Sequence, residues 1–191
     1  VIQNLVKESI KKKIPILTFF TFSTENWKRP KKEISFLFKL IEDYFNKEIN
    51  NLKKNGVKIN ILGNIKSLPK KIKKCLIKSI NITKSCKNIR VNLAINYGSK
   101  HEILNTFKIL KKSQTKVTEK NFEKKLYTKG IPDPDLLIRT GGKKRLSNFL
   151  LWQLSYSEIY FVKKLWPDFT VNDFNRVLDH FKKVKRNFGK V

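Results

Sequence analysis

Short apolar runs alternate with longer amphipathic stretches along this chain, and this alternation constrains its fold more than any other feature. The apolar runs consist mainly of Ile, Leu, Val and Phe and hardly alternate with polar residues. Such runs are typical of strands that are buried on both faces of a parallel sheet. The expected strands are residues 16–22, 57–63, 89–96, 135–140 and 158–162.

The stretches between these runs carry apolar residues at helical spacing. From Pro30 to Asn55, for example, apolar residues recur every three or four positions until Gly56 ends the pattern. The alternation of strands and helices predicts an α/β fold, with a mostly parallel central sheet covered by helices on both faces. The expected helices are residues 1–12, 30–54, 67–85 and 100–112, with two more starting at 118 and 170.

The length and composition favour one domain over residues 1–191. A chain of 191 residues, 40% of them hydrophobic, is long enough to bury its own core. No apolar run approaches the roughly 20 residues of a membrane-spanning helix, and the first residues show no secretory signal. Cys75 and Cys86 have neither CxxC spacing nor a histidine neighbour. We therefore expect no disulfide or cysteine metal site, and a reducing, cytoplasmic compartment.

The net charge of +28, from 43 Lys and Arg against 15 Asp and Glu, has two interpretations. One is a surface for nucleic acid or for anionic membrane. The other is a general enrichment in Lys, Asn and Ile along the whole chain. The second is favoured, because the lysines are scattered over many expected helix faces. A local attraction to anionic lipid at the inner membrane surface stays open.

Polar clusters follow three of the expected strands, at the sheet edge where ligands bind in α/β folds. They are "STEN" at 23–26, "NYGSKHE" at 96–102 and "RTGGKKRLSN" at 139–148. In the third cluster, two arginines, a serine hydroxyl and a glycine turn precede an expected helical stretch. Together with free backbone N–H groups, these suit a phosphate or diphosphate. An ordinary solvated loop that caps a helix is the alternative.

Glu158 begins the last expected strand, ten residues after Asn148. A carboxylate near a diphosphate site is typical of Mg²⁺ binding, because Mg²⁺ bridges carboxylate and phosphate oxygens. A surface glutamate at a strand start is an equal interpretation on spacing alone. Asp133 and Asp135 are better explained as a rigid turn set by the prolines beside them.

Residues 22–30, "FSTENWKRP", end the first strand with a dense group of polar side chains. Glu25 and Asn26 could orient a reacting group, and Trp27 could cover an apolar substrate. Alternatively, the polar residues cap the next helix and Trp27 lies in the core. His101 and His180 have no triad or metal partner by spacing, so we expect both to be structural or solvated.

Four stretches of the chain resemble, in order and spacing, the motifs of the cis-prenyltransferases, the isoprenyl transferase or undecaprenyl diphosphate synthase family. They are "LTFFTFSTENWKRP", "NLAINYGSKHEIL", "PDLLIRTGGKKRLSNFLLWQLSYSEIYF" and "LWPDF". The resemblance covers almost the whole chain, and the chain lacks the DDxxD clusters of trans-type synthases. It implies the fold of that family and an enzyme that condenses isopentenyl diphosphate with an allylic diphosphate such as farnesyl diphosphate. The product would be a cis-polyprenyl diphosphate, the lipid carrier for cell-wall glycan synthesis.

The resemblance also implies roles for single residues. Asn26 would be the catalytic residue that accepts the proton, Glu158 would hold the Mg²⁺ cofactor, and the enzyme would be a homodimer. The implied substrate-binding residues are Ser23, Thr24, Glu25, Trp27, Arg29, Arg139, Arg145, Leu146 and Ser147.

Some family features have no counterpart in residues 1–191. The glycine-rich "DGNGRWA"-type loop, which binds the allylic diphosphate and supplies a second Mg²⁺ carboxylate, is missing. We therefore expect this chain to lack an N-terminal strand and a phosphate-binding loop, and to be almost inactive alone. Lys144 stands at a position where other members of the family often have His or Gln. At residues 96–100 this chain has "NYGSK" where the family usually has "NYGGR".

Two other functions stay open. A non-catalytic or decayed subunit of such an enzyme is disfavoured, because Arg139, Arg145, Ser147 and Glu158 are intact. A basic nucleic-acid-binding domain is less favoured still, because no aromatic residues are interleaved with basic ones for base stacking.

Overall fold

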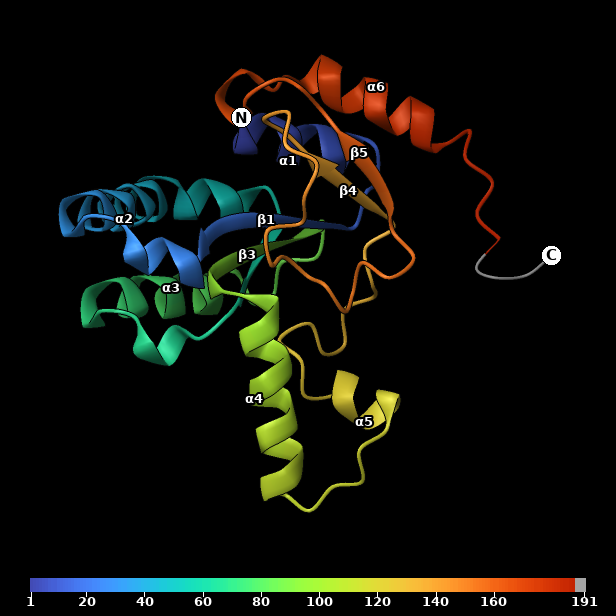
Figure 1. Ribbon diagram of the computed structural model, residues 1–191. Coiled ribbons are helices and arrows are strands. Elements are labelled where there is room, and N and C mark those ends of the chain that lie inside the picture. Colours follow the sequence, from blue (N-terminus) through green and yellow to red (C-terminus); the bar gives the residue numbers. More distant parts are fainter. Residues whose placement is uncertain (188–191) are drawn as a thin grey trace.

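Parallel strands form the centre of the fold in a computed structural model that describes residues 1–187 (Figure 1). In this part of the chain β3 lies between β1 and β2 in one sheet, β4 pairs with β5 in a second sheet, and all neighbours run parallel. The parallel α/β fold expected from the sequence is confirmed, although the strands are divided between two sheets. Their bounds are β1 Ile16–Ser23, β2 Val57–Leu62, β3 Ile89–Tyr97, β4 Leu136–Arg139 and β5 Glu158–Phe161.

The helices begin and end within a few residues of the expected positions. The longest helix, for example, ends just before Gly56. This residue has a φ of +69°, and a side chain there would also collide with Asn88, because an added Cβ would lie 2.4 Å from Asn88 Nδ2. The helices are α1 Ile2–Lys11, α2 Lys31–Lys54, α3 Lys70–Thr83, α4 Ser99–Lys112, α5 Glu119–Glu123 and α6 Val171–Phe181. The 3₁₀ turns are η1 Thr24–Lys28, η2 Ile65–Ser67 and η3 Trp166–Asp168.

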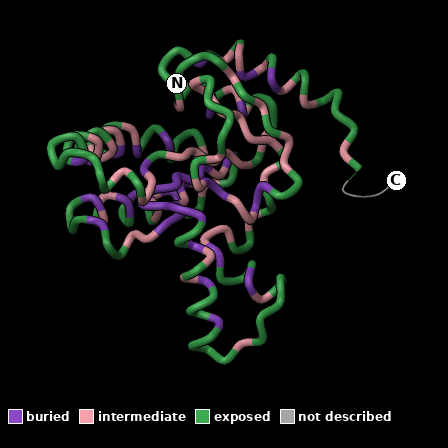
Figure 2. The backbone as a smooth tube through the Cα atoms, viewed as in Figure 1, coloured by how far each residue is buried: buried purple, intermediate pink, exposed green. Residues whose placement is uncertain are grey.

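Buried residues concentrate on the three-stranded sheet and the elements packed against it (Figure 2). Leu93 and Ile95 of β3 belong to the cluster formed with α2 and α3. Ala94 belongs to a different cluster, formed with the segment after β4. Because successive strand residues point to opposite faces, β3 is covered on both sides. This explains its continuous apolar sequence.

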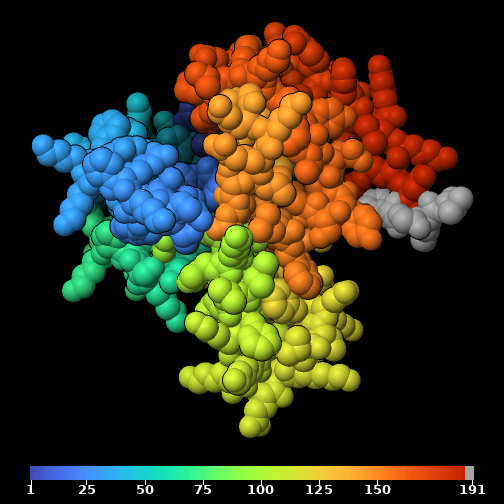
Figure 3. Space-filling model, viewed as in Figure 1, coloured from blue at the N-terminus to red at the C-terminus, as the bar shows by residue number. Residues whose placement is uncertain are grey.

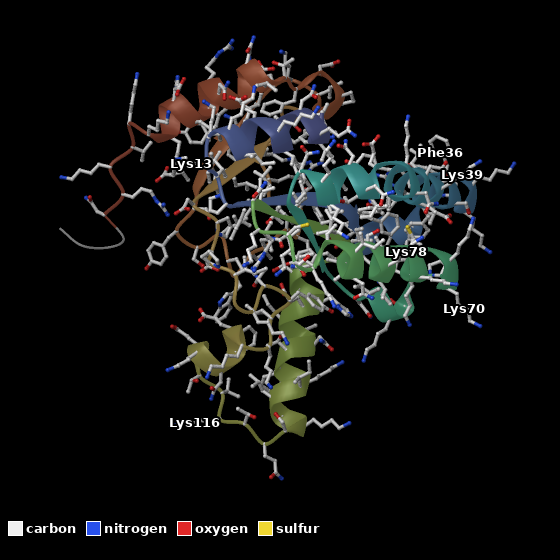
Figure 4. The ribbon with its side chains drawn as sticks, turned by 180° about the vertical axis from the view of Figure 1, so that it is seen from behind. Lys13, Phe36, Lys39, Lys70, Lys78 and Lys116 are labelled. Atoms are coloured by element: carbon white, nitrogen blue, oxygen red, sulfur yellow. The ribbon has the colours of Figure 1, made fainter. Side chains whose placement is uncertain are left out.

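Lysine side chains extend from different elements of the fold. Figure 4 labels Lys13 after α1, Lys39 on α2, Lys70 and Lys78 on α3, and Lys116 after α4. This distribution agrees with the scattered pattern in the sequence. Among the described residues, no helix combines the length and apolar composition needed to cross a membrane.

Two local expectations are wrong. The helical stretch expected after Arg145 does not form, and the chain makes a series of turns there. Positive φ angles at three residues of that segment are incompatible with a helix. The S-x-x-E spacing of Ser99 and Glu102 predicts a capping box at the start of the helix expected over 100–112. Gly98 is instead the N-cap residue of α4 and Ser99 already lies in the helix, so no capping box forms. The Glu102 side chain is buried instead.

Candidate active site

Three segments that follow strand ends meet at Gly98, between β3 and α4. The backbone of Gly98 is extended, with φ of −157°, so the small size of the residue is what matters. An added Cβ would lie 2.3 Å from Thr24 Oγ1 and 2.8 Å from Asn148 Nδ2. The loops after β1 and β4 therefore touch the start of α4, at the edge where parallel sheets bind ligands. In Figure 3 the orange segment after β4 lies against the blue segment after β1.

Asn148 connects these segments through hydrogen bonds. Its Nδ2 donates to Glu25 Oε1 at 2.7 Å, and its Oδ1 accepts from the backbone N–H of Lys100 at 2.8 Å. Its backbone carbonyl accepts from the N–H of Ser99 at 2.8 Å. The φ of Asn148 is +63°, a conformation that asparagine adopts more readily than most residues. Asn148 thus fixes the loop after β4 relative to Glu25.

The charge state of Glu25 follows from these contacts. Partial burial raises its pKa, but hydrogen bonds from Asn148, from the backbone of the turn, and from Ser23 and Thr24 outweigh the burial. The pKa of Glu25 is therefore lowered from its ordinary value. An ionised carboxylate can only accept hydrogen bonds, so Glu25 can orient a hydroxyl or N–H donor but cannot bind an anion directly.

The η1 turn shapes the cluster after β1. The backbone N–H of Ser23 donates to Asn26 Oδ1 at 2.9 Å, and the two side chains form a reciprocal capping box. Ser23 and Asn26 thus do form a cap, but on the η1 turn and not on the helix expected from Pro30, whose N-cap residue is Pro30 itself. An amide oxygen has two lone pairs, so the cap leaves Asn26 able to contact a bound molecule.

Trp27 is partly packed and partly exposed. Its ring contacts Phe22 and Phe38 edge to face, whereas 39% of its surface stays accessible. Its Nε1 donates to Asn96 Oδ1 at 2.7 Å, and Asn96 Nδ2 donates to the carbonyl oxygen of Asn64 at 2.8 Å. The indole is therefore held in place at the end of β1 with part of its surface free for an apolar ligand.

The predicted anion-binding residues border a large cavity. Arg139, Arg145 and Leu146 contribute to the wall of a space of about 820 Å³. Arg139 is half-buried, and its Nε is buried without a hydrogen-bond partner. Leaving a buried donor of a charged group unpaired is costly, so an anionic ligand would satisfy Arg139. Arg145 and Ser147 are exposed in the loop that follows.

The backbone of this loop is less available than the sequence suggested. The N–H of Gly141 donates to the carbonyl oxygen of Lys164 at 2.7 Å, and that of Gly142 donates to Val162 at 3.0 Å. Both glycines have positive φ angles, +84° and +69°. The glycines therefore make the turn possible but do not offer their own N–H groups to an anion.

Two predicted site residues lie apart from this group. Arg29 pairs with Glu33 Oε1 at 2.7 Å near the start of α2, where both side chains are exposed. Glu158 pairs in register with Leu136 at the amino end of β4, whereas Arg139 ends the strand. Three residues along a strand correspond to about 10 Å. Within the described residues no group of three or more His, Cys, Asp or Glu is placed to hold a metal ion.

Sequence reasoning missed the role of the buried Glu102. It accepts hydrogen bonds from the Tyr97 hydroxyl at 2.6 Å, the Tyr127 N–H at 2.6 Å and Gln153 Nε2 at 3.2 Å. Burial, with the charge of Glu102 beside it, raises the pKa of Tyr97, so its hydroxyl stays a donor. These bonds tie α4 to the end of β3, to the segment before β4 and to the turns after β4. No sequence pattern marks such a residue, since acidic groups in a first helical turn are usually solvated.

Known proteins resemble this chain along nearly its whole length. The family model Prenyltransf, which describes undecaprenyl diphosphate synthases, matches residues 1–189. The isoprenyl transferase of Rickettsia bellii is 43% identical over 190 residues, which are 99% of this chain and 84% of the relative. That of Thermotoga maritima is 44% identical over 194 residues, 99% of this chain and 83% of the relative.

Solved structures show the same similarity. A crystal structure described as "a probable undecaprenyl diphosphate synthase" from Campylobacter jejuni superposes with a TM-score of 0.92 and 39% identity, over 99% of this chain and 90% of the other. Lavandulyl diphosphate synthase from Lavandula x intermedia, in complex with dimethylallyl diphosphate, gives a TM-score of 0.93 and 29% identity, over 98% of this chain and 84% of the other.

Proposed function

Because the chain belongs to the undecaprenyl diphosphate synthase family, we propose that it takes part in the condensation of isopentenyl diphosphate with an allylic diphosphate such as farnesyl diphosphate. The product is a cis-polyprenyl diphosphate, and we propose that it serves as the lipid carrier for cell-wall glycan synthesis. The observation that supports this best is the half-buried Arg139, whose Nε has no partner at the wall of the cavity.

In the proposed reaction, the allylic carbon–oxygen bond breaks and its electron pair leaves with the diphosphate. The terminal double bond of isopentenyl diphosphate supplies the electrons of the new carbon–carbon bond. Loss of a proton from the neighbouring carbon then forms the new cis double bond. Negative charge grows on the leaving oxygens, so fixed cations and N–H donors accelerate the step.

We assign the diphosphate of isopentenyl diphosphate to Arg139, Arg145 and Ser147, with Leu146 contacting the apolar part. Guanidinium groups bind such oxygens strongly, because their donors match the acceptor geometry. The lavandulyl diphosphate synthase of the same fold is described with dimethylallyl diphosphate, an allylic diphosphate. This supports a second site of that chemistry here.

We assign the other contacts to the segment after β1. Ser23, Thr24 and Glu25 orient the substrates, Trp27 covers their apolar chain, and Arg29 exchanges its exposed partner Glu33 for a phosphate oxygen. Exposed ion pairs of this kind contribute little to stability, so the exchange costs little. Asn26 is the catalytic residue, and its amide oxygen is oriented by the Ser23 N–H toward the proton that leaves.

We also propose Mg²⁺ as the cofactor, with Glu158 as one ligand. When bound, Mg²⁺ would neutralise diphosphate charge. Glu158 starts β5 about three strand residues away from Arg139, and one carboxylate is few protein ligands even for Mg²⁺, so the proposal includes a second carboxylate. Glu158→Gln should lower the activity of a complete enzyme, and higher Mg²⁺ should restore only part of it. A wild-type Mg²⁺ response would leave Glu158 as a strand-start residue.

A homodimer and a cytoplasmic location, with contact to an anionic inner membrane surface, complete the proposal. On the outer strand β5, 38% of the surface of Ile159 and 40% of that of Phe161 are exposed. Exposed apolar side chains favour contact with a second copy of the chain over contact with nucleic acid.

The test is a radiolabelled elongation assay on residues 1–191, beside a version that carries the N-terminal segment of the Rickettsia bellii relative. Polyprenyl product is expected from the extended version and almost none from residues 1–191. Comparable product from both would refute the missing-loop interpretation. Absence of product from both, with diphosphate binding intact, would favour a non-catalytic subunit. Arg139→Gln in the extended version controls for the assigned site.

A further inference from the structure

One long stretch of this chain contains no acidic residue. Between Glu48 and Glu102 there is neither Asp nor Glu, although lysines continue throughout. α3 lies within this stretch and has lysine at positions 70, 71, 73, 74 and 78. The positive charge of α3 is therefore not offset by its own helix or by the strands before and after it.

The exposed side of α3 combines lysines with an apolar side chain. Lys70, Lys74, Ile77 and Lys78 are all exposed, and their i, i+4, i+7 and i+8 spacing places them on one face of the helix. The buried residues of α3 lie on the opposite face and belong to the core cluster of the three-stranded sheet. The outer face of α3 is therefore basic, with the 42% exposed Ile77 within it.

α2 packs beside α3 and extends this face. The two helices are joined where Lys71 Nζ lies 3.1 Å from Glu42 Oε2. On α2, Phe36 and Leu40 lie one turn apart and are 60% and 49% exposed. Lys39, beside Leu40 in the sequence, is exposed as well. Large apolar side chains and lysines thus occur together on both helices.

The side chains of both helices share one side of the molecule. Figure 4 shows the labelled residues of α2 and α3 projecting from the same side, away from the sheet. The exposed Asp43 of α2 offsets one charge, and the balance stays positive. The α2–α3 outer face is the surface formed by Phe36, Lys39, Leu40, Lys70, Lys74, Ile77 and Lys78.

An anionic membrane surface matches both parts of this face. Anionic head groups attract clustered lysines, and apolar side chains enter the boundary between head groups and acyl chains. Nucleic acid would use the lysines alone, because Leu40 and Ile77 have no ring that could stack on a base. The apolar residues therefore favour a lipid surface.

α4 is a weaker candidate for the same partner. It exposes Leu104 and Phe107 by 62% and 48%. However, it packs against α5, which carries the exposed Glu119 and Glu123. These carboxylates reduce the positive potential beside α4, and the α2–α3 outer face is the better match for negative charge.

We propose that the α2–α3 outer face docks the protein on an anionic membrane. The choice of partner rests on the proposed function, because an enzyme with a lipid product works beside a membrane. α2 begins three residues after η1 ends, so a membrane on this face lies near the segment assigned to the apolar substrate chain. In Figure 1, β5 lies on the side of the three-stranded sheet away from α2 and α3. Contact with a second copy through β5 therefore leaves the face free.

The test is flotation of residues 1–191 with vesicles, which requires no catalytic activity. Vesicles of equal parts phosphatidylglycerol and phosphatidylcholine should bind the chain, and vesicles of phosphatidylcholine alone should bind it much more weakly. Each lysine near an anionic surface raises the affinity roughly fivefold. A triple variant with Lys70→Gln, Lys74→Gln and Lys78→Gln should therefore bind the anionic vesicles at least about tenfold more weakly.

A matched control replaces three exposed lysines of α4, Lys108, Lys111 and Lys112, with glutamine. It removes the same charge, but charges farther than about 8 Å from the membrane are largely screened at physiological ionic strength. The control should therefore lose less than about threefold in affinity. Phe36→Ser with Ile77→Ser keeps every charge and removes apolar contact, so it should also weaken binding at least about threefold.

Three results would overturn the proposal. The first is no binding of residues 1–191 to the anionic vesicles. The second is an equal loss in the two lysine variants, which would show that net charge and not this face controls binding. The third is polyuridylic acid binding that exceeds vesicle binding and is unchanged by the serine substitutions, which would identify a nucleic-acid surface. Elongation by the extended version in detergent should not change in the α3 lysine variant, so failure of docking leaves the proposed function standing.

Discussion

Replacing Asn148 with alanine should uncouple the loop that carries Arg145 from Glu25. The substitution removes the hydrogen bond to Glu25 Oε1 at 2.7 Å and the one from the Lys100 N–H at 2.8 Å. A hydrogen bond contributes about 0.5–1.5 kcal/mol to stability, and a bond to a charged group contributes more. Because Glu25 is exposed to solvent, we count its bond to Asn148 at about 1.5 kcal/mol, the upper end of the ordinary range. Alanine at φ of +63° adds roughly 1–2 kcal/mol of backbone strain. The free energy of unfolding should therefore fall by about 3 kcal/mol.

Asn148→Gly separates the two contributions. It loses the same side-chain bonds but adopts positive φ without strain, so its stability should lie about 1–2 kcal/mol above that of the alanine variant. Asn172→Ala, at an exposed position of α6, is the control. Urea unfolding measures stability, and calorimetry with inorganic diphosphate measures binding. Both Asn148 variants should bind diphosphate more weakly. Equal stability of the two would refute the strain estimate, and unchanged binding in both would refute the positioning role.

Three further predictions concern other contacts. Gly98→Ala should lower the thermal midpoint, because its Cβ would lie 2.3 Å from Thr24 Oγ1; a second change, Thr24→Ala, should restore part of the loss, and no rescue would contradict the steric cause. Arg139→Gln should weaken binding of inorganic diphosphate at least tenfold, whereas Arg176→Gln on exposed α6 should change it less than twofold in the same calorimetric titration. Hydrogen bonds from a neighbouring lysine and threonine lower the pKa of Asp173 below its ordinary 3.8. The stability that the ionised Asp173 provides is therefore present above that pH and lost as the pH falls below it. Asp173→Asn should accordingly unfold more easily than the wild type near neutral pH, and the difference should shrink in acid.

The strands were predictable because burial on both faces leaves a direct mark on composition. β3 shows this, since Leu93 and Ala94 face different clusters and both must be apolar. Helix boundaries followed from local signals such as Gly56. The division into two sheets was not predictable, because each apolar run fits either one continuous sheet or two. Pairing across long sequence separations is set by tertiary packing and not by local pattern.

The site could be predicted by residue type but not by geometry. Arg139 lines the cavity and its Nε has no hydrogen-bond partner, and the anion site itself stays a prediction. The turns after β4 escaped prediction because bonds from Asn148 to the start of α4 hold the backbone at positive φ, against the local helical tendency. The engagement of the Gly141 N–H with Lys164 and the distance of Glu158 from Arg139 also depend on how β4 and β5 are placed. That placement is a non-local property.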